Sequence, residues 1–162
     1  GGYGLIRFSP LLPRLFLLVA VAGIIVTAML CMRQTDLKAL IALSSISHMN
    51  LVIAAVLVQT SWSFAGAMMM MIAHGLTSSA LFCLANMSYE RTYSRTLILL
   101  RGAMVILPLT AAWWLITLLL NMALPPSMNF YAELLILASL FNWSKLTFLL
   151  MISNLVFTTA YT

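Results

Sequence analysis

Three titratable side chains occur at positions where an apolar sequence would not normally retain them. His48 and His74, the only histidines, each lie near the middle of an apolar segment, and Glu133 follows the Pro125-Pro126 break in a later one. An ionisable group in the middle of a membrane segment costs about 2.5–3.5 kcal/mol on insertion scales, so it usually marks function. An imidazole can also take up a proton on one nitrogen and release it from the other near neutral pH. These residues predict a proton or ion path through a membrane domain.

Hydroxyl side chains accompany both histidines. Each histidine has two of them three and four residues away on one helix flank, namely Ser44 and Ser45 beside His48, and Thr77 and Ser78 beside His74. The alternative interpretation is that each imidazole only forms hydrogen bonds between packed helices. Two histidines in successive segments, each with such neighbours, favour a water-lined path.

Glu133 is a second kind of candidate, because it lies beside an expected break in a membrane helix. It follows Ser127 by about two helical turns, and Ser127 can cap the half-helix that carries it. Broken membrane helices expose backbone groups and are tolerated where they line a cavity or are buried in protein. A carboxylate beside such a break is typical of an ion or proton site. The alternative is a structural pair with a basic residue of a neighbouring subunit.

Lys38 lies at the start of the segment that contains His48, ten residues before it. That separation is about 15 Å along a helix. Lys38 either takes part in proton transfer or is an interfacial anchor, with Asp36 or lipid phosphates as its partner. We include it in the predicted proton path with both roles open.

Other chemistry is not indicated. Cys31 and Cys83 lack the spacing of a metal site or a redox motif, and four consecutive methionines at 68–71 point all round a helix instead of converging on an ion. No catalytic Ser-His-Asp set, phosphate loop, dinucleotide fingerprint or haem ligand pair stands out. We therefore expect this chain to bind no cofactor and no metal.

The composition defines the elements that must position these residues. The chain has 162 residues, of which 64% are hydrophobic and 7% are charged, whereas a soluble domain carries about a quarter charged residues. We predict an all-α, polytopic transmembrane helical bundle of about five to six membrane segments, with residues 1–162 forming a single membrane domain. The net charge of +5 fits loop topology and not nucleic-acid binding.

Apolar runs of spanning length predict the segments. We expect spans at 11–32, 39–58, 61–86, 102–124 and 145–161, together with a helix at 128–140 that is too short to cross alone. The Pro125-Pro126 pair breaks one helix into two halves. Trp113 and Trp114 lie inside a span and are expected to pack between helices.

The basic residues predict an orientation. The connections 33–38 and 88–101 are separated by an even number of spans, so they share one face, which the positive-inside rule makes the inner one. Arg7 and Arg14 fall on the other face and do not follow the pattern.

Several ordered motifs resemble the subunit 4 family of mitochondrial NADH–ubiquinone oxidoreductase (complex I). They are RQTDLKALIA at 33–42, SSISHM at 44–49, MIAHGLTSSALFCLAN at 71–86, YERT at 89–92 and ALPP at 123–126, with Glu133 close behind. The resemblance covers essentially the whole chain. It implies an antiporter-like core subunit of the membrane arm that takes part in proton translocation across the mitochondrial inner membrane, coupled to electron transfer from NADH to ubiquinone.

The resemblance also implies roles and surroundings. His48, His74 and Glu133 fall on the family's central hydrophilic axis, and Lys38 lies near it. An essential glutamate and two buried lysines of the family would precede Gly1, so we expect a fragment of a longer antiporter-like proton-translocating module. The implied partners are other membrane-arm subunits and the lipid bilayer, and the implied enzyme is an H⁺-translocating NADH:ubiquinone reductase with no redox chemistry on this chain. The alternatives are a cation/proton antiporter subunit of the same fold and a purely structural membrane subunit.

Overall fold

Long apolar helices running side by side make up the described part of the chain. The computed structural model describes residues 3–4 and 15–162, apart from the side chain of Ala103. Its helices are α2 (Leu15–Met32), α3 (Leu37–Val58), α4 (Ser61–Thr92), α5 (Ala103–Ile106), α6 (Pro108–Asn121), α7 (Met128–Trp143) and α8 (Lys145–Tyr161). The predicted all-α bundle is confirmed. The sequence-predicted positions 5–14, with Arg7, Arg14 and the start of the first span, lie outside the described residues.

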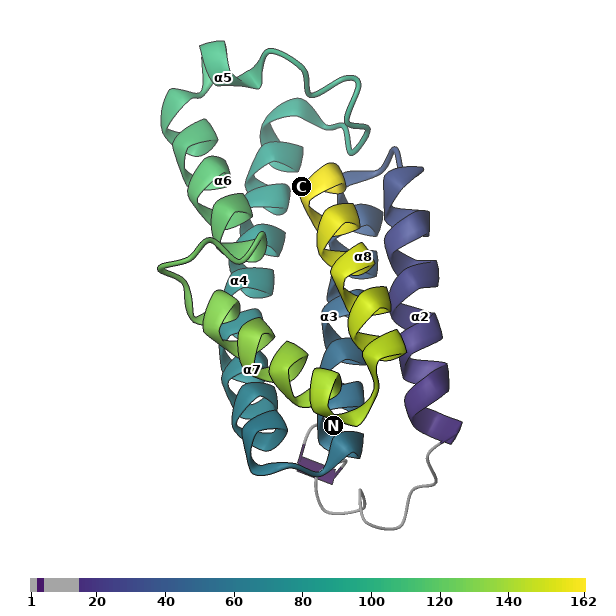
Figure 1. Cartoon of the computed structure of the whole chain (residues 1–162). Helices are drawn as coiled ribbons and strands as arrows, with labels where there is room; N and C mark the ends of the chain where they lie inside the picture. The colour runs from purple at the N-terminus through teal and green to yellow at the C-terminus, as the bar shows by residue number, and fades with distance from the viewer. Residues whose placement is uncertain (1–2, 5–14) are drawn as a thin grey trace.

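In the described part of the chain, three helices, α2, α3 and α4, are long and apolar enough to cross a membrane by themselves. A tight turn at Gln59 and Thr60 joins α3 to α4. Gln59 ends α3 in the left-handed conformation, with φ of 58°, and Thr60 caps α4 by accepting a hydrogen bond from the backbone N–H of Ser63. Because the turn is short, the two helices run antiparallel and pack against each other along their length (Figure 1).

Helices α2, α6 and α7 pack on this hairpin. α2 packs along α3, α7 packs mainly against α4, and α8 contacts both α2 and α7 (Figure 1). The core between them contains fully buried side chains such as Ile24, Met70 and Ile136. Large apolar side chains also cover the outer surface, for example Leu15, Leu149 and Val156, each more than 60% exposed. Such an apolar exterior suits a hydrocarbon surrounding and not water.

The helix break predicted at Pro125-Pro126 is confirmed. α6 ends at Asn121 and α7 begins at Met128, while Ala123 between them has a left-handed backbone with φ of 58°. The two halves are about 21 and 24 Å long, which is short of the roughly 30 Å hydrocarbon core. In Figure 1 they follow one another down the same side of the bundle, so together they provide one discontinuous crossing.

The expectation of one continuous span over 102–124 was wrong. α5 ends at Ile106, and Leu107 interrupts the helical backbone before α6 starts at Pro108. Proline favours the first helical position because its missing N–H is not needed there. The sequence-predicted span therefore contains a four-residue helix, an interruption and the first half of the broken helix.

The third predicted span was too short. α4 continues six residues past Asn86, to Thr92, so residues 88–92 of the expected loop are helical. The remaining connection pairs with the one that links α2 to α3: Leu37 N–H donates to Arg95 O over 3.0 Å, and Leu97 N–H donates to Thr35 O over 2.9 Å. The predicted sharing of one face by the two connections is thus confirmed, while the assignment of that face to the inner side stays a prediction.

Candidate functional site

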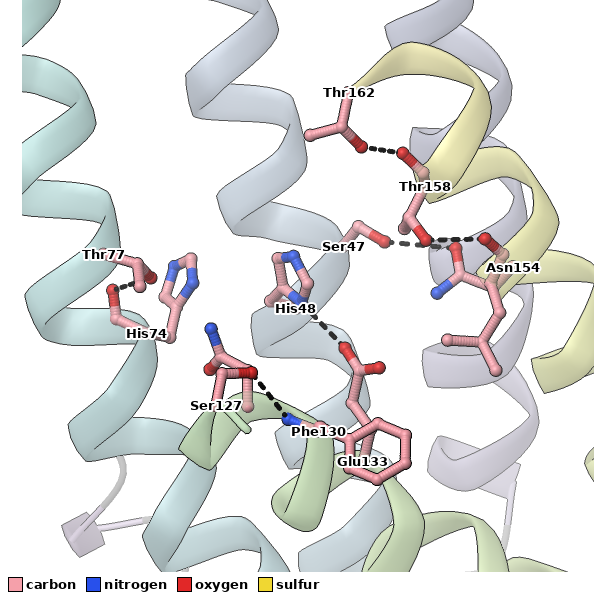
Figure 2. A network of polar contacts seen from close by, with 12 residues as sticks. Ser47, His48, His74, Thr77, Ser127, Phe130, Glu133, Asn154, Thr158 and Thr162 are labelled. Carbon is pink, nitrogen blue, oxygen red and sulfur yellow. Dashed lines mark hydrogen bonds and ion pairs between the residues drawn. The ribbon is translucent and has the colours of Figure 1, made fainter. Parts of the chain in front are cut away.

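The structure brings His48, His74 and Glu133 together from three helices, α3, α4 and α7 (Figure 2). The two imidazole ring centroids are 5.2 Å apart, with the ring planes 38° from each other. His48 Nδ1 lies 3.8 Å from Glu133 Oε1. The three residues are only 4%, 4% and 8% exposed. We call these three residues the buried cluster, and His48 is its middle member.

The α3–α4 hairpin positions the two histidines. They lie about three helical turns before and four turns after the Gln59–Thr60 turn, and this places them at comparable depth on facing helices. Their rings point toward each other between α3 and α4 (Figure 2). The local reason is the tight capped turn, since a longer connection would not set the register of the two helices so closely.

The helix break positions Glu133. Ser127 caps α7 by accepting a hydrogen bond from Phe130 N–H over 3.4 Å, as the sequence predicted. Asn129 then ties the two halves together, because its side-chain N–H donates to Leu120 O, at the end of α6, over 2.8 Å. From this fixed start, the second turn of α7 directs the Glu133 carboxylate toward His48 (Figure 2).

The geometry of the cluster suits proton exchange. Nδ1 of His48 faces the carboxylate, while its Nε2 is buried and, among the described residues, has no hydrogen-bond partner. The separation of 3.8 Å is longer than the donor–acceptor distance of a hydrogen bond, which is at most about 3.2 Å. Proton transfer from His48 to Glu133 therefore needs a small side-chain rotation. An imidazole with one nitrogen toward a carboxylate and a second imidazole beside it can pass a proton between them.

Lys38 is not brought to the buried cluster. It is the second residue of α3, is half-buried, and holds its Nζ 5.6 Å from the centroid of the Tyr89 ring. Arg95 lies over the same ring, with Cζ 4.8 Å from its centroid. Cations over an aromatic face are attracted to it, and this contact holds Lys38 at the end of the bundle.

The hydroxyl groups expected beside the histidines bond mainly to their own helices. Ser44 donates to Ile41 O over 2.7 Å, and Thr77 donates to His74 O over 3.2 Å. In α-helices Ser and Thr commonly satisfy themselves in this way. Among the described residues, these two hydroxyls form no hydrogen bond to either imidazole.

A polar contact between α3 and α8 was not predicted from the sequence. Ser47, next to His48, donates to Asn154 Oδ1 over 3.4 Å, and both residues are buried (Figure 2). On α8, Thr147 and Thr158 are also buried on this side. Their spacing of seven and four residues about Asn154 is the helical signal that could have identified this polar face. The role of Asn129 was not predicted either, although an asparagine just after a predicted helix break can form a hydrogen bond across it.

Trp113 and Trp114 differ in their surroundings, and so do the two cysteines. Trp114 packs between α6 and α4 and donates from Nε1 to Ser88 Oγ over 3.1 Å, but Trp113 is 55% exposed, so its expected packing between helices was wrong. Cys31 is buried and Cys83 is exposed, both as free thiols. A separate apolar pocket of about 690 Å³ lies between the end of α4 and α6, away from the buried cluster.

Comparison with known sequences gives a consistent family. The family described as "NADH:quinone oxidoreductase/Mrp antiporter, TM" matches residues 1–159. "NADH-ubiquinone oxidoreductase chain 4" of Squalus acanthias is 56% identical over 99% of this chain, and the protein of that name from Crotalus adamanteus is 53% identical over 99%. The chain spans 36% of the length of the Squalus relative and 73% of that of the Crotalus relative.

Chains of two solved complexes have a fold similar to that of this chain. A chain of "Respiratory complex I from Thermus thermophilus with bound NADH" matches 98% of this chain with a TM-score of 0.86 and 28% identity, over 33% of its own length. A chain of "Structure of Mrp complex from Dietzia sp. DQ12-45-1b" matches 99% with a TM-score of 0.88 and 26% identity, over 19% of its own length.

Proposed function

Because this chain belongs to the NADH:quinone oxidoreductase/Mrp antiporter family of transmembrane proteins, we propose that it is part of a core membrane-arm subunit of respiratory NADH–ubiquinone oxidoreductase. In this proposal the subunit spans the mitochondrial inner membrane several times. It moves protons across that membrane while the complex transfers electrons from NADH to ubiquinone. The relatives at 53–56% identity, all named as chain 4 of that enzyme, support this assignment.

The contact of three titratable groups from three helices is the observation that carries the proposal. His74 and His48 exchange a proton between their rings, and His48 and Glu133 exchange it across the 3.8 Å gap between Nδ1 and Oε1. The low exposure of the three side chains, at most 8%, supports direct passage of the proton between them. Lys38, at the end of α3, serves the aqueous end of the same path.

The chemistry of the cluster assigns the redox steps to other subunits. Imidazoles and a carboxylate move protons and do not carry electrons, so this chain binds no cofactor in our proposal, and NADH and ubiquinone are used elsewhere in the complex. Its partners are the other membrane-arm subunits and the lipid bilayer, which cover the exposed apolar faces of helices such as α2 and α8. Nucleic acid is not a partner.

A cation/proton antiporter subunit is the second candidate function. The observation that favours it is the similarity of the backbone to that of the Mrp complex chain, with a TM-score of 0.88. The same fold is compatible with either activity. Its identity of 26% is less than half the 53–56% of the relatives named chain 4 of NADH-ubiquinone oxidoreductase, which favours the respiratory enzyme. A third alternative is a purely structural subunit, in which the buried cluster only holds the helices together.

Glu133→Gln in the full-length subunit of the assembled complex tests the proposal. The amide keeps the size of the carboxyl group but cannot exchange a proton, so coupled proton pumping should fall on the order of tenfold or more. Glu90→Gln is the matched control, because Glu90 is exposed at the end of α4 and accepts a hydrogen bond from Asn86. Unchanged proton-pumping stoichiometry in Glu133→Gln would support the structural alternative.

His74→Met addresses the structural alternative from the other side of the cluster. Methionine fills a similar volume in an apolar helix but cannot carry a proton. We expect the complex to assemble and its pumping to slow several-fold, as measured by blue-native electrophoresis and by proton uptake in proteoliposomes. A complex that fails to assemble would instead show that His74 holds the helices together.

A further inference from the structure

Gly66 lies where α4 and α7 approach each other closely. A Cβ atom placed on Gly66 would lie 2.9 Å from Ile136 Cγ1, 3.1 Å from Leu135 Cβ and 3.2 Å from the backbone oxygen of Ala132. Carbon atoms in contact normally lie about 3.5–4.0 Å apart. Any side chain at this position therefore requires α7 to shift relative to α4.

The atoms that Gly66 faces cannot yield independently of α7. The Ala132 oxygen belongs to the helix backbone, and Leu135 Cβ is fixed directly to it. Ile136 is fully buried, with 0% exposure, so its side chain is enclosed by the packed interior. The contact is thus set by the backbone of α7 and not by the end of a flexible side chain.

The contact lies next to the buried cluster. Ala132 directly precedes Glu133 in α7, and α7 packs along α4 for much of its length. A movement that takes the Ala132 oxygen away from α4 also moves the Cα of Glu133, whose carboxylate is already at 3.8 Å from His48 Nδ1. The separation of these two groups therefore depends on the close helix contact at Gly66.

We propose that Gly66 is a positioning residue: its missing side chain lets α7 lie close enough to α4 for Glu133 to reach His48. This inference rests on the proposed function of the buried cluster. Glycine inside a helix is less favourable than alanine, and so its presence in the middle of α4 is explained by what it allows. Small residues also serve membrane helix packing in general, and the experiment must separate that role from positioning.

The first test compares two glycines of the same helix in the full-length subunit of the assembled complex. Gly66→Ala adds one methyl group against α7, and Gly75→Ala adds the same group where no atom outside its own stretch of α4 lies within 4 Å, although Gly75 is next to His74. We expect Gly66→Ala to lower proton pumping several-fold and Gly75→Ala to leave it unchanged. If an assembled Gly66→Ala complex pumps protons as fast as the unmodified complex, the proposal is overturned.

The second test combines Gly66→Ala with Glu133→Gln in a double-mutant cycle, which reports coupling between residues. If Gly66 acts through Glu133, the second change adds no further loss of pumping to Glu133→Gln. If Gly66→Ala lowers pumping by the same factor with and without Glu133→Gln, it acts as packing alone and the proposal is wrong. Should Glu133→Gln alone have no effect, the proposed function fails instead, so the two failures are distinguishable.

A milder variant decides the case in which Gly66→Ala does not assemble. Gly66→Ala with Ile136→Ala removes the closest contact but retains those with Leu135 Cβ and the Ala132 oxygen. We expect this complex to assemble with reduced pumping and, in its cryo-EM structure, a His48–Glu133 separation longer than in the unmodified complex. Ile136→Ala alone is the control for the lost side chain. Normal pumping in the double variant, or failure of both Gly66 variants to assemble, would overturn the assignment.

Discussion

Titratable residues gather in two regions of this molecule, and the two regions treat them differently. At the end of the bundle, Lys38 and Arg95 face the Tyr89 ring, and the two connections at this end are joined by backbone hydrogen bonds. In the interior, the buried cluster places two imidazoles and a carboxylate next to one another, and other buried polar side chains such as Ser47 and Thr77 lie on the same helices. Charges at the end of a membrane helix need no special purpose, because they reach water or headgroups. The interior groups are costly to place in a membrane segment, and this difference supports our proposal that the cluster carries protons.

The two regions also differ in how they are held. Backbone pairing of residues 35–37 with residues 95–97 fixes the charged end, independently of which side chains are present. The cluster depends instead on three helices meeting at one depth, with α7 started by Ser127 and Asn129 at the helix break. We therefore expect substitutions in the interior to affect function more strongly than substitutions at the charged end.

The largest expected effect is that of His48→Gln, which removes the middle member of the cluster. Glutamine keeps hydrogen-bonding groups at this position but cannot relay a proton between His74 and Glu133. Coupled pumping should fall on the order of tenfold or more, as measured by proton uptake in proteoliposomes with the assembled complex. Normal pumping in this variant would show that the proton path does not pass through His48. The buried cluster would then not differ in function from the charged end of the bundle.

An intermediate effect is expected at the framework of the cluster. Asn129→Leu removes the hydrogen bond to Leu120 O across the helix break and leaves that carbonyl without this donor. Losing a buried hydrogen bond costs about 1–3 kcal/mol, so the thermal unfolding temperature should fall and pumping should drop by a few-fold. If the unfolding temperature falls but the number of protons pumped per electron pair is unchanged, the Asn129–Leu120 hydrogen bond supports the fold without setting the position of Glu133.

The smallest effect is expected at the charged end, from Lys38→Arg. Arginine keeps the positive charge and can stack on Tyr89, but it does not release its proton in proteins. Since water can partly replace an end group of a path, we expect pumping to fall by only about twofold. If Lys38→Arg is normal while Lys38→Met disrupts assembly, Lys38 is an anchor of α3 and not part of the path.

The sequence predicted the elements better than their contacts. Apolar length gave the ends of α8, and Pro125-Pro126 gave the break that precedes Glu133. The extension of α4 to Thr92 was missed because Tyr89, Glu90 and Arg91 look like a loop, although a helix can continue beyond the apolar segment when its last turn is solvated. Composition cannot indicate that a helix leaves the hydrocarbon before it ends.

The site was predicted in its residues but not in its geometry. His48, His74 and Glu133 are conspicuous because each is costly in an apolar segment, and this signal is local. Their contact depends on the register of the α3–α4 hairpin and on how closely α7 approaches α4, which involve residues far apart in the chain. The Ser47–Asn154 contact joins residues 107 positions apart, and no local pattern could have paired them.

Redox-induced infrared difference spectroscopy on the assembled complex tests the central claim most directly. The claim is that Glu133 exchanges protons with His48 during turnover, and the carbonyl stretch of a protonated carboxyl group reports this exchange. We predict a carboxyl band that changes when NADH is added, is absent in Glu133→Gln, and changes on the order of tenfold more slowly in His48→Gln. A band that persists in Glu133→Gln, or that responds at the normal rate in His48→Gln, would contradict the account.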